Sequence, residues 1–424
     1  MAAMRLIPAP STRPGLPGPA ATPPGVPCVL SLNAGASSIK FALHRSGPGL
    51  VHLLGGQIAR IGQGYGTLVI QRAAEAQPTT QPVDVDDHAA AVALLMDWLV
   101  REVGPDGIAA VGHRIAHGMR HTEPETLTPV LLQELRSFMP QDPEHLAGAI
   151  ALVEAFGNAW PALPQVACFD TAFHHHMPRV ATMLPLPRRC EAQGVRRYGF
   201  HGLSYAFLME ELARLDGPQA AQGRVVLAHL GNAASLAAVH RGRSIDTSMG
   251  FTPSSGMPMG THAGDLDPGI AEYMERTGRM GRRQFDDMVQ HGSGLLGMSE
   301  TSADMRELLQ REATDTRAAE AIAVFCYQAK KYVGAYAAAL GGIETLVFAG
   351  GIGEHAAPVR ARICEGLGFL GIELDAARNA AHEPVASSAA SRVVVRVMHT
   401  DEEQMIARSV CRVAGLQCSM PPTA

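Results

Sequence analysis

Two segments of the chain, roughly 200 residues apart, repeat the same short design, and this repeat constrains the possible folds more than any other feature. In the first, a strand-like apolar run leads into a turn of small residues, Asn33–Ser38, and a second run begins at Ile39. In the second, the run that ends at Leu230 leads into the turn Gly231–Ser235. Each unit is predicted to be a β-hairpin with small residues at its tip. A duplicated domain explains the repeat better than coincidence, and each half would then present a tip rich in backbone amides to one shared cleft.

The rest of the chain alternates between helical and strand-like apolar spacing. Helical periodicity extends over Asp87–Val103, Val130–Phe138, Glu144–Phe156, Tyr205–Leu215, Asp304–Arg311, Arg317–Leu340, Ala356–Leu367 and Asp401–Val413. Short apolar runs typical of strands occupy Val29–Leu32, Ile39–Leu43, Ile108–Gly112, Gln165–Phe169, Val225–Leu230, Leu236–Val239, Thr345–Phe348 and Val393–Met398. The order of these elements predicts an α/β fold in which a mixed sheet carries helices on its faces.

The composition limits the class of protein. A length of 424 residues favours two or three domains. The formal net charge of −5 offers no basic surface for nucleic acid, and the longest apolar stretch, Ala89–Val100, is too short to cross a membrane. Seven cysteines without a C-x-x-C pair predict reduced thiols and a cytoplasmic protein. Residues 1–27 hold eight of the 29 prolines and are predicted to be a disordered tail.

Polar residues cluster in the first hairpin and after the next predicted strand. Asn33, Ser38 and Lys40 surround a tip whose backbone amides can approach phosphate oxygens, although an ordinary hairpin turn favours the same residue types. Arg114 follows the strand Ile108–Gly112 and offers a planar fork for a carboxylate or phosphate; the alternative is a surface arginine. Open α/β sheets bind ligands at such strand ends.

An aspartate and several histidines mark the middle of the chain. Asp170 ends the strand Gln165–Phe169, a common place for a catalytic or metal-linked carboxylate. Three adjacent side chains cannot all face one ion in regular structure, so the run His174–His176 is interpreted as structural. His201 is a candidate for substrate contact, with a satisfied structural histidine as the alternative.

Three loop segments complete the set of candidates. The segment 246–269 is rich in Gly, Pro, Ser and Asp, and loops this long inside a compact domain are often functional. Gly350–Gly353 joins a strand to a helix, where glycines bring backbone close to a nucleotide, although such a turn alone is a weak signal. Thr400–Glu403 opens the last helix, and it either caps that helix or supplies a carboxylate to Mg²⁺.

In this order, the segments resemble acetate kinase and its acyl-kinase relatives over roughly Val29 to Arg412. The similarity is most specific in 169–174, 196–202 and 246–253. The resemblance implies the sugar kinase/Hsp70/actin fold, an α/β architecture with two duplicated ribonuclease H-like domains around a central cleft.

The resemblance also implies an activity and a domain division. The activity is reversible phosphoryl transfer from ATP to acetate, giving acetyl phosphate and ADP, with propionate as a possible further substrate. Mg²⁺ would be the cofactor, Mn²⁺ a substitute, and the enzyme a cytoplasmic homodimer without a nucleic-acid or membrane partner. The acyl and phosphate side would comprise 28–170 with 403–424, and the nucleotide side 171–402.

The family pattern assigns roles to individual positions of this chain. The catalytic group would be Asp170, Arg114, His201, His229 and His262. The carboxylate substrate would contact Arg114, Ala116, Pro140, Phe200 and Pro253. The nucleotide and its phosphates would lie along Lys40, Ser38, His229, Gly231, Asn232, Asp304, Met305, Arg306, Gly351, Ile352, Gly353 and His355. The metal would be held by Asn33 and Glu402.

The sequence departs from the family pattern at positions that matter for this chemistry. His262 stands where the family has an arginine; histidine is shorter, is charged only below a pKa near ~6.5, and lacks the guanidinium fork. Ala116 replaces a valine, and the larger acyl pocket is expected to admit propionate or a longer acyl group as well as acetate. His355 replaces an asparagine near the adenine. Two alternatives therefore stay open: another phosphoryl donor such as pyrophosphate, and a weakly active or non-catalytic regulatory relative.

Overall fold

The computed structural model describes residues 27–418 apart from positions 36, 48, 105–106 and 141. Nearly all of the predicted tail, residues 1–27, lies outside these described residues.

Both predicted hairpins form. β1 (Cys28–Ala34) and β2 (Ser38–Arg45) pair antiparallel, with Leu30 opposite Leu43. β9 (Arg224–Leu230) and β10 (Ala234–His240) pair in the same way, with Ala228 opposite Leu236. β1 and β9 are buried along nearly their whole length, which explains why both read as continuous apolar runs.

Each hairpin lies inside one of two sheets, and the five strands of the second sheet match five strands of the first in order and direction. The first sheet has the order β5-β4-β3-β2-β1-β6-β8-β7, with β3 (Val51–Ala59), β4 (Gly66–Arg72), β5 (Thr79–Val83), β6 (Ile108–Ile115), β7 (Glu125–Thr126) and β8 (Gln165–Phe169). The second has the order β11-β10-β9-β12-β13, with β11 (Arg243–Thr247), β12 (Thr345–Ala349) and β13 (Val394–Val397). The strands β3-β2-β1-β6-β8 correspond to β11-β10-β9-β12-β13, with antiparallel pairing on one side of the central strand and parallel pairing on the other. This correspondence confirms the predicted α/β duplication.

Helices form wherever the periodicity predicts them. These are α1 (His88–Val103), α2 (Pro129–Ser137), α3 (Pro143–Ala159), α6 (Gly202–Asp216), α11 (Met305–Arg311), α12 (Thr316–Leu340), α14 (Ala357–Cys364) and α16 (Glu402–Ala414). The structure adds α4 (Arg179–Thr182), α5 (Arg188–Ala192), α7 (Pro218–Gln222), α8 (Gly269–Arg276), α9 (Arg282–His291), α10 (Gly294–Ser299), α13 (Gly350–His355), α15 (Ala376–Ala380) and the 3₁₀ turns η1 (Ala172–His174) and η2 (Gly368–Leu370). α14 ends before the predicted Leu367 because Gly366 turns the chain at a φ of +77°. Within the described ranges, no helix is both long and apolar enough to span a membrane.

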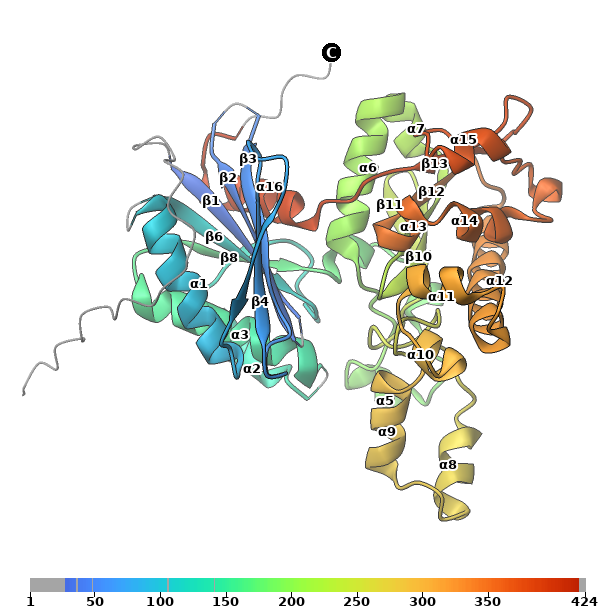
Figure 1. The fold of residues 1–424 in the computed structure, drawn as a ribbon, viewed down its shortest axis with the longest axis horizontal. Helices are drawn as coiled ribbons and strands as arrows, with labels where there is room; N and C mark the ends of the chain where they lie inside the picture. The colour runs from blue at the N-terminus through green and yellow to red at the C-terminus, as the bar shows by residue number, and fades with distance from the viewer. Residues whose placement is uncertain (1–26, 36, 48, 105–106, 141, 419–424) are drawn as a thin grey trace, which may run out of the picture.

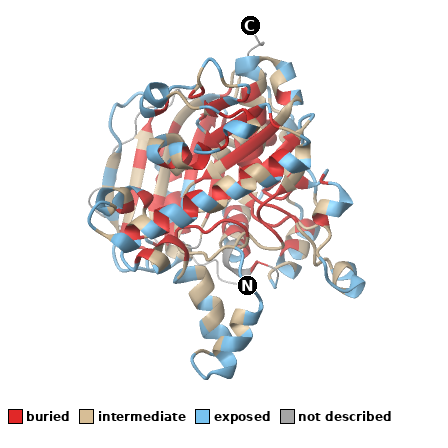
Figure 2. Ribbon diagram, turned by 90° about the vertical axis from the view of Figure 1, so that its right-hand side faces the viewer, coloured by how far each residue is buried: buried red, intermediate tan, exposed pale blue. Residues whose placement is uncertain are grey.

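The alternation of side chains along the strands divides each sheet between two helical layers. In β9, Val226 belongs to the apolar cluster of α12, whereas Val225 belongs to that of α6. In β1, Leu30 packs with α1 and α3, whereas Val29 packs with α16. α6 and α16 contact each other and lie between the two sheets (Figure 1). Seen from the side, the buried strands and helix faces form the interior of this arrangement (Figure 2).

The last helix returns from the second sheet to the first. α16 crosses β6 at Gly112, where an added Cβ would lie 2.3 Å from Ile406 Cγ2 and 2.5 Å from Val410 Cγ2. A glycine here lets the helix approach the sheet closely, and the helix thereby begins, at Glu402, near the ends of the strands of the first sheet. The domain limits of 28–170 with 403–424 and of 171–402 remain a prediction.

The cysteines differ from the expectation at one pair. Cys411 in α16 and Cys418 beyond it form a disulfide, so the prediction that all thiols are reduced is wrong for these two. Gly415 adopts a left-handed φ of 65° after the helix, and this turns the chain back so that the two Cα atoms lie 5.9 Å apart. The remaining five cysteines lie outside this disulfide and keep reduced thiols, as the sequence predicts.

Candidate active site

A cavity of about 1280 Å³ lies where strands of both sheets end. Its wall includes residues at the ends of β1, β6, β9 and β12 and at the start of α16, so one space is shared by the two duplicated halves. Most of the residues predicted for a site line it: Asn33, Ser38, Lys40, Arg114, Ala116, Phe200, His201, His229, Gly231, Asn232, Pro253, His262, Asp304, Met305, Arg306, Gly351, Ile352, His355 and Glu402.

Arg114 joins three of the predicted residues into one network. Its Nη1 donates to Asn33 Oδ1 at 2.9 Å, and its Nε donates to Asp170 Oδ2 at 2.8 Å. Asn33 Nδ2 in turn donates to Glu402 Oε2 at 3.2 Å. Asp170 is fully buried and does not line the cavity, so the structure places it behind Arg114, where it orients the guanidinium.

The charges of this network oppose the effects of burial. Burial alone would raise the pKa of Glu402, but the positive charges of Arg114 and Lys40, together with the hydrogen bond from Asn33, outweigh burial and lower it. The adjacent Glu403 shows the opposite direction, because burial and the charge of Glu402 both raise its pKa. Although burial opposes it, the carboxylates of Asp170 and Glu402 raise the pKa of Arg114, which stays charged. The cavity therefore holds the ionised carboxylate of Glu402 beside the fixed cation of Arg114.

This donor set suits a hard cation. An ionised Glu402 beside the amide of Asn33 supplies oxygen ligands, and Mg²⁺ takes only one or two protein carboxylates while keeping several waters. The described residues hold no group of three or more His, Cys, Asp or Glu side chains arranged to bind a metal. The two residues therefore fit Mg²⁺ that is shared with phosphate oxygens better than a metal held in a protein cage.

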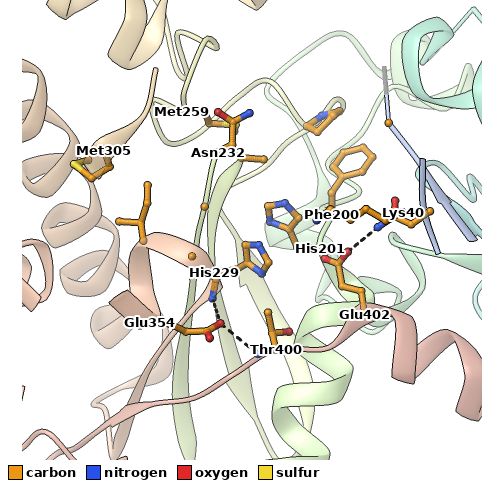
Figure 3. Close-up of a pocket in the computed structure, with 18 of the residues that line it drawn as sticks. Lys40, Phe200, His201, His229, Asn232, Met259, Met305, Glu354, Thr400 and Glu402 are labelled. Atoms are coloured by element: carbon orange, nitrogen blue, oxygen red, sulfur yellow. Dashed lines mark hydrogen bonds between the residues drawn. The ribbon is translucent and has the colours of Figure 1, made fainter. Parts of the chain in front are cut away.

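Two histidines stack in the wall of the cavity (Figure 3). The ring centroids of His201 and His229 are 4.2 Å apart. His201 has a left-handed φ of 59°, which a non-glycine residue adopts only under strong local constraint. One such constraint is Gly202, where an added Cβ would lie 2.0 Å from the carbonyl oxygen of Asp170. Burial, the positive charge of Arg114 and that of Lys40 lower the pKa of His229 despite the charge of Glu402, so its ring is neutral near pH 7.

The opposite end of the cavity has the features of a nucleotide site. Gly350 turns β12 into α13 at a φ of +76°, and an added Cβ there would lie 2.8 Å from the carbonyl oxygen of Leu230. Glu354 Oε1 accepts the amide hydrogen of Gly350 at 3.0 Å and holds the turn. Asp304 caps α11 and accepts from the backbone nitrogen of Arg306 at 2.8 Å, so the exposed guanidinium of Arg306 lies beside it at the rim.

Apolar side chains and His262 also line the cavity. Phe200, Ala116 and Pro253 line the cavity, as predicted for a small acyl group, and Met249 and Met259 extend this surface. His262 also lines the cavity, and its Nδ1 is hydrogen-bonded to the backbone carbonyl of Gln290 in α9. 

Besides Asp170, two predicted site residues do not line the cavity. Pro140 is exposed and does not line the cavity, so the structure offers no contact between it and an acyl group there. Gly353 is buried inside α13 and contributes to the packing of that turn. His174, interpreted as structural, is buried with Nδ1 on Ser244 and Nε2 on the carbonyl of Phe200.

Four polar cavity residues have no role in the predicted site: Glu354, His399, Thr400 and Glu403. Glu354 Oε2 is 3.0 Å from His399 Nδ1, while its Oε1 accepts from the backbone nitrogen of Thr400 at 3.4 Å. Asp401 caps α16 by accepting from Gln404, so Thr400 is available for a different contact, with Ser204. The signal for these residues was their position: Glu354 follows the glycine turn, and Thr400 precedes the predicted metal ligand.

The chain is similar to known proteins over most of its length. The model of the acetokinase family matches residues 28–408. An acetate kinase of Rhodopseudomonas palustris is 43% identical over 392 residues, covering 91% of this chain and 98% of the relative. A propionate kinase of Citrobacter rodentium is 39% identical over 394 residues, covering 91% and 96%. The structure is similar to those of an acetate kinase from Porphyromonas gingivalis (TM-score 0.82, 34% identity, 92% and 100% covered) and a propionate kinase from Francisella tularensis (TM-score 0.85, 32% identity, 91% and 100% covered).

Proposed function

The chain belongs to the acetokinase family, and from this premise we propose that it transfers the γ-phosphoryl group of ATP to acetate, giving acetyl phosphate and ADP, with propionate as a second acceptor. The observation that carries this assignment is the single cavity with two different ends. Lys40, Phe200 and His201 lie on one side of this cavity, and Met305 of the Asp304–Arg306 segment and Glu354 after the Gly350 turn lie on the other (Figure 3). Arg114 lines the same cavity.

The geometry suits direct transfer between two anions. A carboxylate oxygen of acetate attacks the γ-phosphorus, the bond to the β–γ bridging oxygen breaks, and ADP leaves with that electron pair. Acetate is already ionised near neutral pH, so no general base is needed. Arg114, fixed by Asp170 and Asn33, balances charge that spreads over the phosphoryl oxygens, and the histidine pair adds hydrogen-bond donors.

Glu402 and Asn33 are the residues that would hold Mg²⁺, which when bound neutralises charge on the phosphate oxygens. We extend the proposal to Mn²⁺ as a substitute and to a cytoplasmic homodimer on the strength of the family resemblance.

One assay tests the function. Acyl phosphate is trapped as hydroxamate in reactions with acetate or propionate, with ATP or pyrophosphate, and with or without Mg²⁺. Product with ATP, carboxylate and metal together is the expected result. Product with pyrophosphate alone would favour the other donor, against which the Asp304–Arg306 segment and the Gly350 turn already argue. If no product forms under any condition, the remaining alternative is a non-catalytic regulatory relative.

Replacing His262 with arginine is expected to raise kcat by ~10-fold or more. An arginine aimed at a transferring phosphoryl group is worth ~10³-fold or more in related chemistry, and a histidine cannot reproduce its permanent charge and fork. The His262→Lys variant, which restores charge without the fork, is the matched control and should gain less. Rates are measured at saturating ATP and acetate, and an unchanged or lower kcat in His262→Arg would contradict the prediction.

Replacing Ala116 with valine is expected to lower kcat/KM for propionate about tenfold relative to acetate. Ala116 is almost fully buried in the cavity wall, so the added methyl groups take space that a longer acyl chain would use, and apolar contact of this size is worth ~1–2 kcal/mol. Ala303→Val, at the nucleotide end, is the control, since it should leave the acetate-to-propionate ratio unchanged. An equal loss for both acids in Ala116→Val would show that this residue does not set chain length.

A further inference from the structure

The two stacked histidines are held by two hydroxyl pairs of the same design. His229 Nδ1 is 2.8 Å from Ser204 Oγ, which is 2.7 Å from Thr400 Oγ1. His201 Nδ1 is 2.8 Å from Ser235 Oγ, which is hydrogen-bonded to the hydroxyl of Tyr205. In each case a serine lies between the ring and a second hydroxyl group.

The direction of these hydrogen bonds follows from counting hydrogens. A serine hydroxyl has one hydrogen to donate. If Ser235 donated to Tyr205, the tyrosine hydrogen would have no acceptor among the described residues, and Tyr205 is fully buried. A buried donor without an acceptor costs about 1–3 kcal/mol. Every hydrogen therefore has an acceptor only when Tyr205 donates to Ser235 and Ser235 donates to His201 Nδ1.

The second pair has the same design, but Thr400 is half-buried and lines the cavity, so burial does not fix the direction of its hydroxyl group. The arrangement that matches the first pair has Thr400 donating to Ser204 and Ser204 donating to His229 Nδ1. A ring nitrogen that accepts a hydrogen bond carries no hydrogen, and in a neutral imidazole the hydrogen is then on Nε2. Nε2 lies on the side of the ring away from the serine, and both histidines line the cavity (Figure 3).

We propose that the hydroxyl pairs Thr400–Ser204 and Tyr205–Ser235 hold His229 and His201 in the tautomer with hydrogen on Nε2, so that both neutral rings donate to the phosphoryl oxygens. The four hydroxyl residues are positioning residues, since they act through the two rings. The catalytic consequence rests on the proposed phosphoryl transfer, whereas the tautomer itself does not.

The charges around His229 make this arrangement necessary. Arg114 and Lys40 on the first sheet disfavour a second proton on the ring, and the carboxylates of Glu402 and Glu354 only partly offset them and burial. A neutral ring in the other tautomer would turn the lone pair of Nε2 toward anionic oxygens, which is repulsive. The serine therefore determines whether the ring attracts or repels the phosphoryl group that is being transferred.

The chain offers a matched control for the serine–histidine contact. Ser244 Oγ is 2.8 Å from Nδ1 of the buried His174, the same distance as in the two site pairs. His174 does not line the cavity, and its Nε2 is already 3.0 Å from a backbone carbonyl. Ser244→Ala therefore removes an equivalent hydrogen bond without touching the proposed relays.

The first experiment reads the tautomers directly in the full-length protein. Two-bond ¹H–¹⁵N spectra of ¹⁵N-histidine-labelled wild type, with signals assigned through His201→Gln and His229→Gln, are expected to show an unprotonated, hydrogen-bonded Nδ1 in both rings at pH 7.5. Hydrogen on Nδ1 in both rings would overturn the proposal even if the enzyme is active. Absence of acyl phosphate with the expected tautomers would instead overturn the proposed function alone.

The second experiment measures the consequence. Ser204→Ala and Ser235→Ala are each expected to lower kcat by about 10- to 100-fold, with KM for ATP within about twofold, because a wrong tautomer mainly weakens the transition state. Thr400→Val keeps the shape of the side chain and should lower kcat less. Ser244→Ala should leave kcat within about twofold. Equal kcat in Ser204→Ala, Ser235→Ala and Ser244→Ala would reduce the serines to a structural role and overturn the proposal.

Discussion

Arg114→Ala is expected to lower kcat about 10³-fold or more, the largest loss of any single substitution in the cavity. An arginine that balances charge on a transferring phosphoryl group contributes about this much in related enzymes. The guanidinium is held at three nitrogens by Asp170 and Asn33, so it is preorganised and loses little entropy when substrate arrives. Initial rates of acyl phosphate formation at saturating ATP and acetate provide the measurement.

Two controls separate this chemistry from folding. Removing Arg114 takes the partner cation from the fully buried Asp170, which costs about 3–5 kcal/mol of stability in comparable buried pairs. The double variant Arg114→Ala/Asp170→Asn removes that buried charge and should recover much of the stability in urea unfolding while kcat stays low. Arg114→Lys keeps the charge without the fork and should retain an intermediate rate. Recovery of kcat in the double variant would show that Arg114 matters only for folding.

The local pattern of the sequence was sufficient for much of the fold. The hairpins of β1–β2 and β9–β10 and the long helices α1 and α12 depend on apolar periodicity and turn residues within one short segment. Their repetition also predicted the duplication, which the matching strand orders of the two sheets confirm.

The strands that were not predicted depend on partners distant in the sequence. β3 contains Gly55 and Gly56, which weaken a strand pattern. In the fold, Gly56 lies under the ring of Phe41 in β2, where an added Cβ would be 2.4 Å from Phe41 Cζ. The glycine is favourable only because the neighbouring strand supplies that ring, and no local pattern contains this information.

The site shows the same limit. The sequence placed Arg114 and Asp170 at strand ends, but burial decides that the arginine faces the cavity while the aspartate stands behind it. Thr400 and Ser204 meet across 196 positions, and Glu354 and Thr400 across 46. Such contacts exist only after the second sheet and α16 have come together, so reasoning from motifs found Glu402 and left its neighbours unassigned.

The remaining large effect concerns the predicted metal ligand and is obtained by comparing two adjacent glutamates. Both line the cavity at the start of α16, yet their surroundings shift the pKa of Glu402 down and that of Glu403 up. The change from glutamate to glutamine keeps size and removes the charge. The substitution therefore removes a negative charge at Glu402, which is ionised beside Arg114. It removes less negative charge at Glu403, because that carboxyl group gains a proton more readily.

Glu402→Gln is accordingly expected to lower kcat/KM for ATP at fixed Mg²⁺ by on the order of 10²-fold or more, and to raise the Mg²⁺ concentration needed for half-maximal rate. Glu403→Gln should stay within a few-fold of wild type in both quantities. The measurement is a Mg²⁺ titration of the initial rate for the wild type and both variants, with urea unfolding to confirm that each is folded. An equal loss in both variants would assign the effect to the packing of α16, whereas an unchanged Mg²⁺ requirement in Glu402→Gln would place the metal on other residues. The contrast between neighbours whose pKa values shift in opposite directions but that share one helix turn therefore tests the metal site independently of the fold.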